Sequence, residues 1–242
     1  MNIGLIIAGG VGARVNNSTP KQFIMVKGKP VIAYTLEVFQ NNSQIDAIAV
    51  VCLSGWEDML RKYARQYHLD KLRWIVKGGR TGMESLRNGM ELLRQHCSDD
   101  DIIVIHDAVR PLITDDIINS NIASVAEYGT AVTYIPSTEA LLYSDDGEYS
   151  SEVVDRSKIF RTQTPQSLRL SKFVWAHEEA KKRGITDTVS TCTLLVELGE
   201  TVHFVRGLNT NLKITTAEDF ALFSSYLDAG GERRIHGGVF DD

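Results

Sequence analysis

Cysteine is scarce in this 242-residue sequence, and its three cysteines form no Cys-x-x-Cys pair. Cys52, Cys97 and Cys192 suggest neither a disulfide framework nor a metal site, so they fit a reducing compartment. No apolar run approaches the length of a membrane span. The N-terminus lacks the basic region and cleavage site of a signal peptide. We therefore expect a cytoplasmic protein with no membrane partner.

Positive charge is not in excess either. The sequence has 26 lysines and arginines against 31 acidic residues, a formal net charge of −5. A surface for nucleic acid needs a surplus of cations, so we expect no nucleic-acid partner. Hydrophobic residues make up 43% of the chain, which is enough for a globular core. Any cations that bind a ligand should therefore be gathered in one site.

Strand-like and helix-like segments alternate through most of the chain. This alternation predicts an α/β fold in which a parallel sheet has helices on both faces. The predicted strands are 3–7, 47–53, 72–76, 101–105, 131–135 and 201–206. The predicted helices begin near 30 and 114 and span 56–67, 85–93, 171–183, 191–197 and 216–228.

The segment from Pro136 to Phe160 departs from this alternation. Two short strand-like runs, 140–143 and 152–154, flank a Ser-Asp-Asp-Gly turn, which predicts a β-hairpin. A hairpin has too little core to be stable alone, so we expect this arm, residues 137–161, to pack on a second copy of the chain. Residues 1–229 are predicted to form one domain that carries the arm. Residues 230–242, with four glycines and three acids, are predicted to be a loosely ordered tail.

The first predicted strand runs into the glycine-rich loop Ala8-Gly9-Gly10-Val11-Gly12-Ala13-Arg14, and Pro20-Lys21 follows. Glycines leave the backbone bare, and consecutive N–H groups in such a turn bind anions. No Gly-Lys-Ser/Thr closes the loop, and Val15 stands where a dinucleotide fingerprint has its third glycine. With the cations Arg14 and Lys21, the loop indicates a polyphosphate site. The alternative is a glycine-rich turn that merely bends the chain.

Polar clusters follow several predicted strands, and ligands bind at the carboxyl ends of strands in open parallel sheets. The clusters are Gly78-Gly79-Arg80 with Ser85, the run 106–110, and Arg206-Gly207 leading to 211–215. Asp107 is the obvious carboxylate among them. Because Mg²⁺ binds one or two carboxylates together with substrate phosphates, we predict that Asp107 holds Mg²⁺.

Each of these residues also has a simpler interpretation. Asp107 could be paired with Arg110, three residues away. His106 is expected to have a satisfied ring and no catalytic role. Lys213 could be an ordinary surface charge, and Arg156 could form a salt bridge with Asp155 or Glu152.

Four ordered segments resemble the cytidylyltransferases that activate alditol phosphates with CTP. The family includes 2-C-methylerythritol 4-phosphate cytidylyltransferase and ribitol-5-phosphate cytidylyltransferase. The resemblance implies a Rossmann-like, mostly parallel twisted sheet with helices on both faces. It also implies CTP and a phosphorylated acceptor as substrates, Mg²⁺ as cofactor, and a homodimer formed through the arm. The segments are Ile6 to Arg14 with Pro20-Lys21-Gln22-Phe23, Ile103 to Pro111, Gln163-Thr164-Pro165-Gln166, and Asn211 to Thr216.

The same resemblance implies a role for each matching residue. Arg14, Lys21, Lys213 and Arg156 would be catalytic, with Arg156 reaching across the dimer. Nucleotide contacts would come from Ile7, Ala8, Gly9, Gly10, Gly12, Gly79, Arg80, Ser85, Asp107, Ala108 and Arg110. Acceptor contacts would come from Thr138, Ala140, Arg156, Ser190, Lys213 and Thr215, and the metal would be held by Asp107.

Three positions depart from the family pattern. Gly82 stands where relatives usually have arginine, and Arg80 is a candidate substitute. Ala140 follows Glu139 where relatives usually have Asp-Thr, and Ser190 falls where an Asp usually stands. The last two lie on the acceptor side, where unmatched polar groups cause strong rejection of a substrate. The acceptor is therefore left open.

Trp56 and residues 163–167 favour a ribitol-5-phosphate-like acceptor. The alternatives are 2-C-methylerythritol 4-phosphate and another phosphate or phosphonate. A sugar-1-phosphate nucleotidyltransferase that uses another base is a further alternative. From a different class, a CTP-binding module without catalysis would also fit the changed acceptor side.

Overall fold

The structure is a computed structural model that describes residues 1–10 and 19–229. The predictions for Gly12, Arg14 and the tail 230–242 lie outside the described residues.

The centre of the fold is a seven-stranded sheet with the order β11-β7-β10-β6-β1-β4-β5. Strands β1, β4, β5 and β6 pair in parallel, and β11 is parallel to β7. Strand β10 is antiparallel to both of its neighbours, β6 and β7. This confirms a mostly parallel sheet. The strands are β1 (Asn2–Ala8), β4 (Ala47–Cys52), β5 (Leu72–Lys77), β6 (Ile102–Asp107), β7 (Thr130–Pro136), β10 (Phe160–Arg169) and β11 (Phe204–Arg206).

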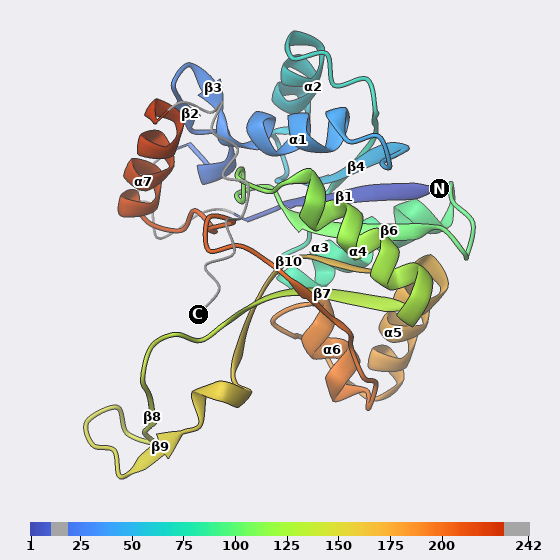
Figure 1. Cartoon of the computed structure of the whole chain (residues 1–242). Helices are drawn as coiled ribbons and strands as arrows, with labels where there is room; N and C mark the ends of the chain where they lie inside the picture. The colour runs from blue at the N-terminus through green and yellow to red at the C-terminus, as the bar shows by residue number, and fades with distance from the viewer. Residues whose placement is uncertain (11–18, 230–242) are drawn as a thin grey trace.

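Helices cover both faces of this sheet, as predicted. Side chains of α1, α2 and α4 share one buried cluster with the sheet, and side chains of α3, α5 and α6 share another. Figure 1 shows α4 in front of the sheet and α3 behind it. The central strands are apolar along their length because helices bury both of their faces. The helices are α1 (Val31–Asn41), α2 (Glu57–Gln66), α3 (Gly82–Arg94), α4 (Asp115–Tyr128), α5 (Leu170–Lys182), α6 (Thr191–Glu197) and α7 (Ala217–Asp228).

A smaller layer flanks the carboxyl end of β1. It contains the short 3-10 helix η2 (Lys21–Phe23) and the two-residue strands β2 (Met25–Val26) and β3 (Lys29–Pro30). Phe223 of α7 is fully buried in a third cluster with Val26 and Ile214. The last helix therefore packs beside the elements that follow the first loop.

The arm between β7 and β10 contains the predicted hairpin. Strands β8 (Leu141–Tyr143) and β9 (Glu152–Val154) pair antiparallel, and η3 (Arg156–Lys158) follows. Figure 1 shows the arm extending away from the sheet. Three large apolar side chains on it are 65–78% exposed: Leu142, Tyr149 and Val153.

The structure corrects the predicted strands in three places. Strand β10 was not predicted, because Gln163, Thr164, Pro165 and Gln166 break the apolar pattern where the ladder also shifts register. The predicted strand 201–206 is shorter, since β11 begins at Phe204. Asp107 ends β6 rather than following it. In the described ranges 1–10 and 19–229, no helix is long and apolar enough to cross a membrane.

Candidate functional site

The carboxyl ends of four parallel strands lie level with one another. In the sheet, Ile7 of β1 stands opposite Asp107 of β6, Ala8 opposite Cys52 of β4, and Cys52 opposite Lys77 of β5. The Ala108 N–H donates to the Ile7 carbonyl over 3.0 Å. The loops that leave these strands therefore start from one edge of the sheet, where ligands bind in this type of fold.

The loops after β1 and β5 meet around Ser85 in the first turn of α3. A Cβ atom on Gly9 would lie 3.1 Å from Ser85 Oγ, and one on Gly78 would lie 3.1 Å from Gly9 Cα. The Gly79 N–H donates to Ser85 Oγ over 3.0 Å, and a Cβ on Gly79 would lie 2.2 Å from Glu84 Cβ. A side chain on Gly79 would therefore force Glu84 to shift, and the two loops leave little room for one on Gly9 or Gly78. The predicted nucleotide residues Gly9, Gly79 and Ser85 are brought together.

Gln22 fixes the start of the glycine-rich loop. Its side chain is 1% exposed, and its Nε2 donates to the carbonyls of Ala8 at 2.7 Å and Gly10 at 3.0 Å. In a trans peptide the N–H points away from the carbonyl, so the Gly9 N–H faces away from Gln22. We did not predict this role, although Gln22 directly follows Lys21 in one of the recognised segments.

Asp107 lies between two cations at the end of β6. Its Oδ2 is 3.1 Å from Arg110 Nε and 3.1 Å from Lys213 Nζ, and its Oδ1 is 3.2 Å from Lys213 Nζ. Burial alone would raise the pKa of Asp107, but the charges of Lys213 and Arg110 outweigh burial and lower it to about 2. Asp107 is therefore a carboxylate at neutral pH. The ion pair with Arg110 that the spacing suggested is present.

Residues 211–215, which we call the strap, cross the sheet edge beside Asp107. Arg110 Nη1 donates to the Asn211 carbonyl over 2.8 Å, and the Ile214 N–H donates to the Val109 carbonyl over 2.9 Å. Lys21 Nζ donates to the Ile214 carbonyl over 3.0 Å. The strap is thereby bonded to Lys21 and Arg110 from two other parts of the chain, and it carries Lys213 to Asp107.

His106 supports this edge from inside the core. Its ring is fully buried, with Nε2 3.2 Å from the Arg110 carbonyl and Nδ1 3.1 Å from the Thr164 hydroxyl. Burial lowers the pKa of His106 to about 4, which leaves the ring neutral at pH 7. The expectation of a satisfied ring is confirmed.

The hydroxyl groups of two predicted acceptor residues, Ser190 and Thr215, form hydrogen bonds at the starts of helices. Ser190 accepts from the Thr193 N–H as the N-cap of α6. The Cys192 N–H at the start of this helix donates to Gln166 of β10, near the site edge. Thr215 donates from its N–H and its hydroxyl to Asp219 at the start of α7.

The other predicted acceptor residues lie in the arm. Arg156 Nη1 donates to the Thr138 carbonyl over 2.6 Å, and both residues are exposed, as is Ala140. Among the described residues Arg156 forms neither of the suggested salt bridges, with Asp155 or with Glu152, and Asp155 pairs with Lys158 at 3.5 Å. Within one copy, the arm leads these residues away from the strap (Figure 1).

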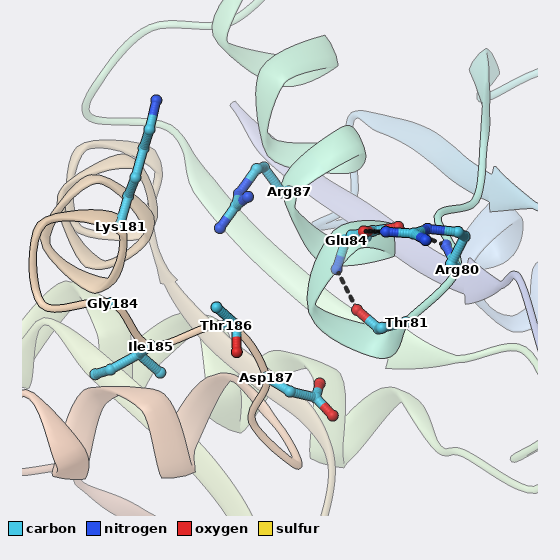
Figure 2. A pocket seen from close by; sticks show the side chains of 9 residues that line it. All are labelled: Arg80, Thr81, Glu84, Arg87, Lys181, Gly184, Ile185, Thr186 and Asp187. Atoms are coloured by element: carbon cyan, nitrogen blue, oxygen red, sulfur yellow. Dashed lines mark hydrogen bonds and ion pairs between the residues drawn. The ribbon is translucent and has the colours of Figure 1, made fainter.

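Arg80 lines a pocket of about 430 Å³ next to the start of α3. Figure 2 shows its guanidinium lying along Glu84, and Nη2 is 3.2 Å from Glu84 Oε1. The pocket is lined by Arg80, Thr81, Glu84, Arg87, Lys181, Gly184, Ile185, Thr186 and Asp187. Neither Asp107 nor Lys213 lines this pocket, so Arg80 does not share it with the charged groups at the end of β6.

Asp107 is the carboxylate at this site that could bind a metal ion, and a single carboxylate suits only an ion whose other ligands come from elsewhere. Within the part of the chain that the structure describes, no group of three or more His, Cys, Asp or Glu residues could hold an ion. Asp107 is ionised and offers about four lone-pair positions, which two cations do not exhaust. Mg²⁺ can be held by one carboxylate when phosphates and water complete its shell. The residues present therefore fit Mg²⁺ that arrives with a polyphosphate.

The site combines glycine-rich loops with an ionised carboxylate between two cations, at the carboxyl edge of a parallel sheet. This combination is typical of proteins that bind phosphorylated nucleotides. The family model for 2-C-methyl-D-erythritol 4-phosphate cytidylyltransferase, IspD, matches residues 3–229. The chain therefore belongs to the IspD family of cytidylyltransferases.

Individual relatives agree with this assignment. The chain is 42% identical to ribitol-5-phosphate cytidylyltransferase of Streptococcus agalactiae serotype III (strain NEM316), over 98% of this chain and 100% of that protein. It is 33% identical to 2-C-methyl-D-erythritol 4-phosphate cytidylyltransferase of Clostridium botulinum (strain 657 / Type Ba4), over 94% and 97%. The crystal structure of 4-diphosphocytidyl-2C-methyl-D-erythritol synthase from Anaerococcus prevotii DSM 20548 shares the fold, with a TM-score of 0.80, 23% identity and coverage of 94% and 96%.

Proposed function

We propose that this protein transfers CMP from CTP to a ribitol-5-phosphate-like alditol phosphate, which yields a CDP-alditol and pyrophosphate. The observation that carries the proposal is the Asp107 carboxylate held between Arg110 and Lys213, with Lys21 bonded to the same strap, beside the loops that meet at Ser85. The 42% identity to ribitol-5-phosphate cytidylyltransferases supports the choice of acceptor.

The chemistry follows from electrostatics. An oxygen of the acceptor phosphate attacks the α-phosphorus of CTP, a new P–O bond forms, and the bond to the β-phosphate breaks with release of pyrophosphate. Two polyanions repel each other, so cations must first bring them together. Lys21, bonded to the strap's Ile214, and Lys213, paired with Asp107, supply this charge, and no covalent intermediate with the protein is needed.

Asp107 is the residue that would hold Mg²⁺ in this proposal. The bound ion would supply positive charge to the phosphate oxygens. Gly9, Gly79 and Ser85 would contact the nucleotide, because the loops that carry them meet at this edge of the sheet. Lys213 is 43% exposed, so its ammonium can turn from Asp107 towards an incoming phosphate.

Substitution of Lys213 by Gln tests the site. By analogy with removal of one charge-stabilising donor, kcat should fall about 10²–10³-fold. Lys62→Gln is the matched control, since Lys62 is an exposed lysine on α2, and its kcat should stay within about twofold. Equal kcat values for the two variants would refute the assigned site.

The acceptor 2-C-methylerythritol 4-phosphate is the second candidate. The matching family model and the Clostridium botulinum relative favour it. Pyrophosphate release from CTP should be measured with ribitol 5-phosphate, 2-C-methylerythritol 4-phosphate and no acceptor. UTP and GTP in place of CTP test the base. The proposal predicts CTP-dependent release that is fastest with ribitol 5-phosphate. Binding of CTP without turnover on any acceptor would instead support a binding module.

We also propose a homodimer formed through the arm. The hairpin exposes Leu142, Tyr149 and Val153, which a second copy would cover. It would also bring Arg156 to the partner's site. Mixing of the Arg156→Ala and Lys213→Gln variants is a sharp test, because a mixed dimer contains one site with both residues intact. Activity should return to about a quarter of the wild-type value in a two-fold symmetric dimer. No recovery, or a monomer by sedimentation, would refute it.

A cytoplasmic location is part of the proposal. Its support is that Cys52, Cys97 and Cys192 are all free thiols, which fits a reducing compartment. Fractionation of the source cells with an antibody against the chain would test it.

A further inference from the structure

We infer that His106 is a positioning residue that, through the Thr164 hydroxyl and the Arg110 carbonyl, keeps the Asp107 carboxylate available to cations and ligand. The inference rests on the proposed function, because it assigns His106 a part in that site. His106 would touch no substrate, since its ring is fully buried behind the strand end.

The partners of the ring assign its tautomer. A backbone carbonyl can only accept a hydrogen bond, so Nε2, 3.2 Å from the Arg110 carbonyl, carries the hydrogen. In the neutral ring Nδ1 is then an acceptor, and the group facing it at 3.1 Å is the Thr164 hydroxyl. His106 Nδ1 therefore accepts a hydrogen bond from the Thr164 hydroxyl.

The orientation of the Thr164 hydroxyl decides whether Asp107 Oδ2 accepts a hydrogen bond from it. Thr164 Oγ1 also accepts from the Asp107 N–H over 3.0 Å, and it lies 3.4 Å from Asp107 Oδ2. A hydroxyl has one hydrogen to donate, and His106 Nδ1 at 3.1 Å is a closer acceptor for it than Asp107 Oδ2 at 3.4 Å. The lone pairs of Asp107 are thus left to Arg110 Nε, to Lys213 Nζ and to a ligand.

Loss of the ring acceptor would redirect the hydroxyl. The hydroxyl would then donate to Asp107 Oδ2, which lies 3.4 Å away. Because one lone pair of this oxygen would be engaged by Thr164, the carboxylate would bind a cation less well. The Nε2 bond matters as well, because the Arg110 carbonyl belongs to the turn that the Arg110 N–H closes on the Asp107 carbonyl at 3.1 Å. Outer partners of this kind typically change affinity or activity about 10–100-fold.

Four variants separate positioning from simple loss of stability. His106→Leu removes both ring bonds, and Thr164→Val removes the hydroxyl. His106→Asn keeps an amide oxygen that can accept near Nδ1, and Thr164→Ser keeps the hydroxyl. All are assayed at a temperature at which circular dichroism shows a fully folded protein.

We expect His106→Leu and Thr164→Val each to lower kcat about 10–100-fold, while both conservative variants recover most of it. The double variant His106→Leu with Thr164→Val should be no slower than the slower single variant, because both act through one hydrogen bond. Wild-type kcat in the folded Thr164→Val variant, or losses that multiply in the double variant, would overturn the inference.

A spectroscopic readout is independent of turnover and of the folding of any variant. In ¹⁵N NMR of the wild-type chain at neutral pH, His106 should show a pyrrole-type Nε2 and a pyridine-type Nδ1. The opposite tautomer, or two protonated nitrogens, would overturn the inference even in an active enzyme. If the wild-type protein shows the expected tautomer but no turnover with any acceptor, the proposed function fails and the hydrogen-bond geometry stands.

Discussion

Replacement of Asp107 by Asn tests whether the charge cluster at the strand end also stabilises the fold. Burial opposes ionisation of this carboxyl, but Lys213 and Arg110 lower its pKa from 3.8 to about 2. At about 1.4 kcal/mol for each pKa unit, that fall corresponds to about 2 kcal/mol of folding free energy. The side chain is 17% exposed, so solvent screens this interaction only in part.

The sign of the pH dependence follows from the direction of the shift. A lowered pKa in the folded state means that the stabilisation is fully present above pH 3.8 and is lost as the pH falls towards 2. The Asp107→Asn variant should therefore be about 2 kcal/mol less stable than the wild type at pH 7. The difference should shrink towards pH 2, where the folded wild-type carboxyl is half protonated, and vanish below that pH.

Urea unfolding followed by circular dichroism at several pH values between 7 and 2 measures this difference. Asp100→Asn is the matched control, because the Asp100 side chain is 94% exposed and its contact with Arg169 is 3.8 Å long. It should change the stability little at any pH. An Asp107→Asn variant as stable as the wild type at pH 7, or a difference that persists unchanged to pH 2, would refute the reasoning.

Three further substitutions have defined outcomes. Gly79→Ala places a Cβ 2.2 Å from Glu84 Cβ, so the loop must shift. The KM for CTP in steady-state assays should then rise severalfold. An unchanged KM would show that Gly79 lies apart from the nucleotide. Gln22→Leu leaves the Gly10 carbonyl without its side-chain donor and should cost about 1–3 kcal/mol in urea unfolding, whereas an unchanged midpoint would contradict that role. His177 is buried, and neither ring nitrogen has a partner in the described residues. Burial and then Arg87 lower the pKa of His177 from 6.5 to about 4. The wild type should therefore lose stability as the pH falls from 6.5 to 4, and His177→Leu should lack this loss. At pH 7 the variant should gain about 1 kcal/mol, or roughly 2–4 °C in Tm, and a lower Tm would contradict this.

Much of the fold was predictable because its strands and helices have regular apolar patterns. Six buried residues mark β4, and Thr114 caps α4 as the sequence indicated. The same reasoning could not find β10, since this strand has polar residues and a proline inside the sheet. Its place between β6 and β7 depends on long-range pairing that local periodicity does not encode.

The site was predictable where a strand end places a residue. Asp107 lies opposite Ile7 because β1 and β6 pair in parallel, and Ser85 meets Gly79 because α3 begins directly after the loop that follows β5. Lys213 was placed by resemblance alone, since its approach to Asp107 depends on bonds between the strap and both Arg110 and Val109. Gln22 and Thr164 were missed as positioning groups, because a buried amide or hydroxyl leaves no periodic signal in a sequence.

The arm starts and ends at neighbouring points of the ladder. Pro136 stands opposite Phe160, and the Ser137 N–H donates to the Ile159 carbonyl over 3.2 Å. An excursion closed at its base can change length at small entropic cost, about 0.6 kcal/mol for each doubling. The arm can therefore change by insertion or deletion at this point while the sheet stays as it is, and a short turn grafted there would yield a trimmed chain that tests what the arm contributes.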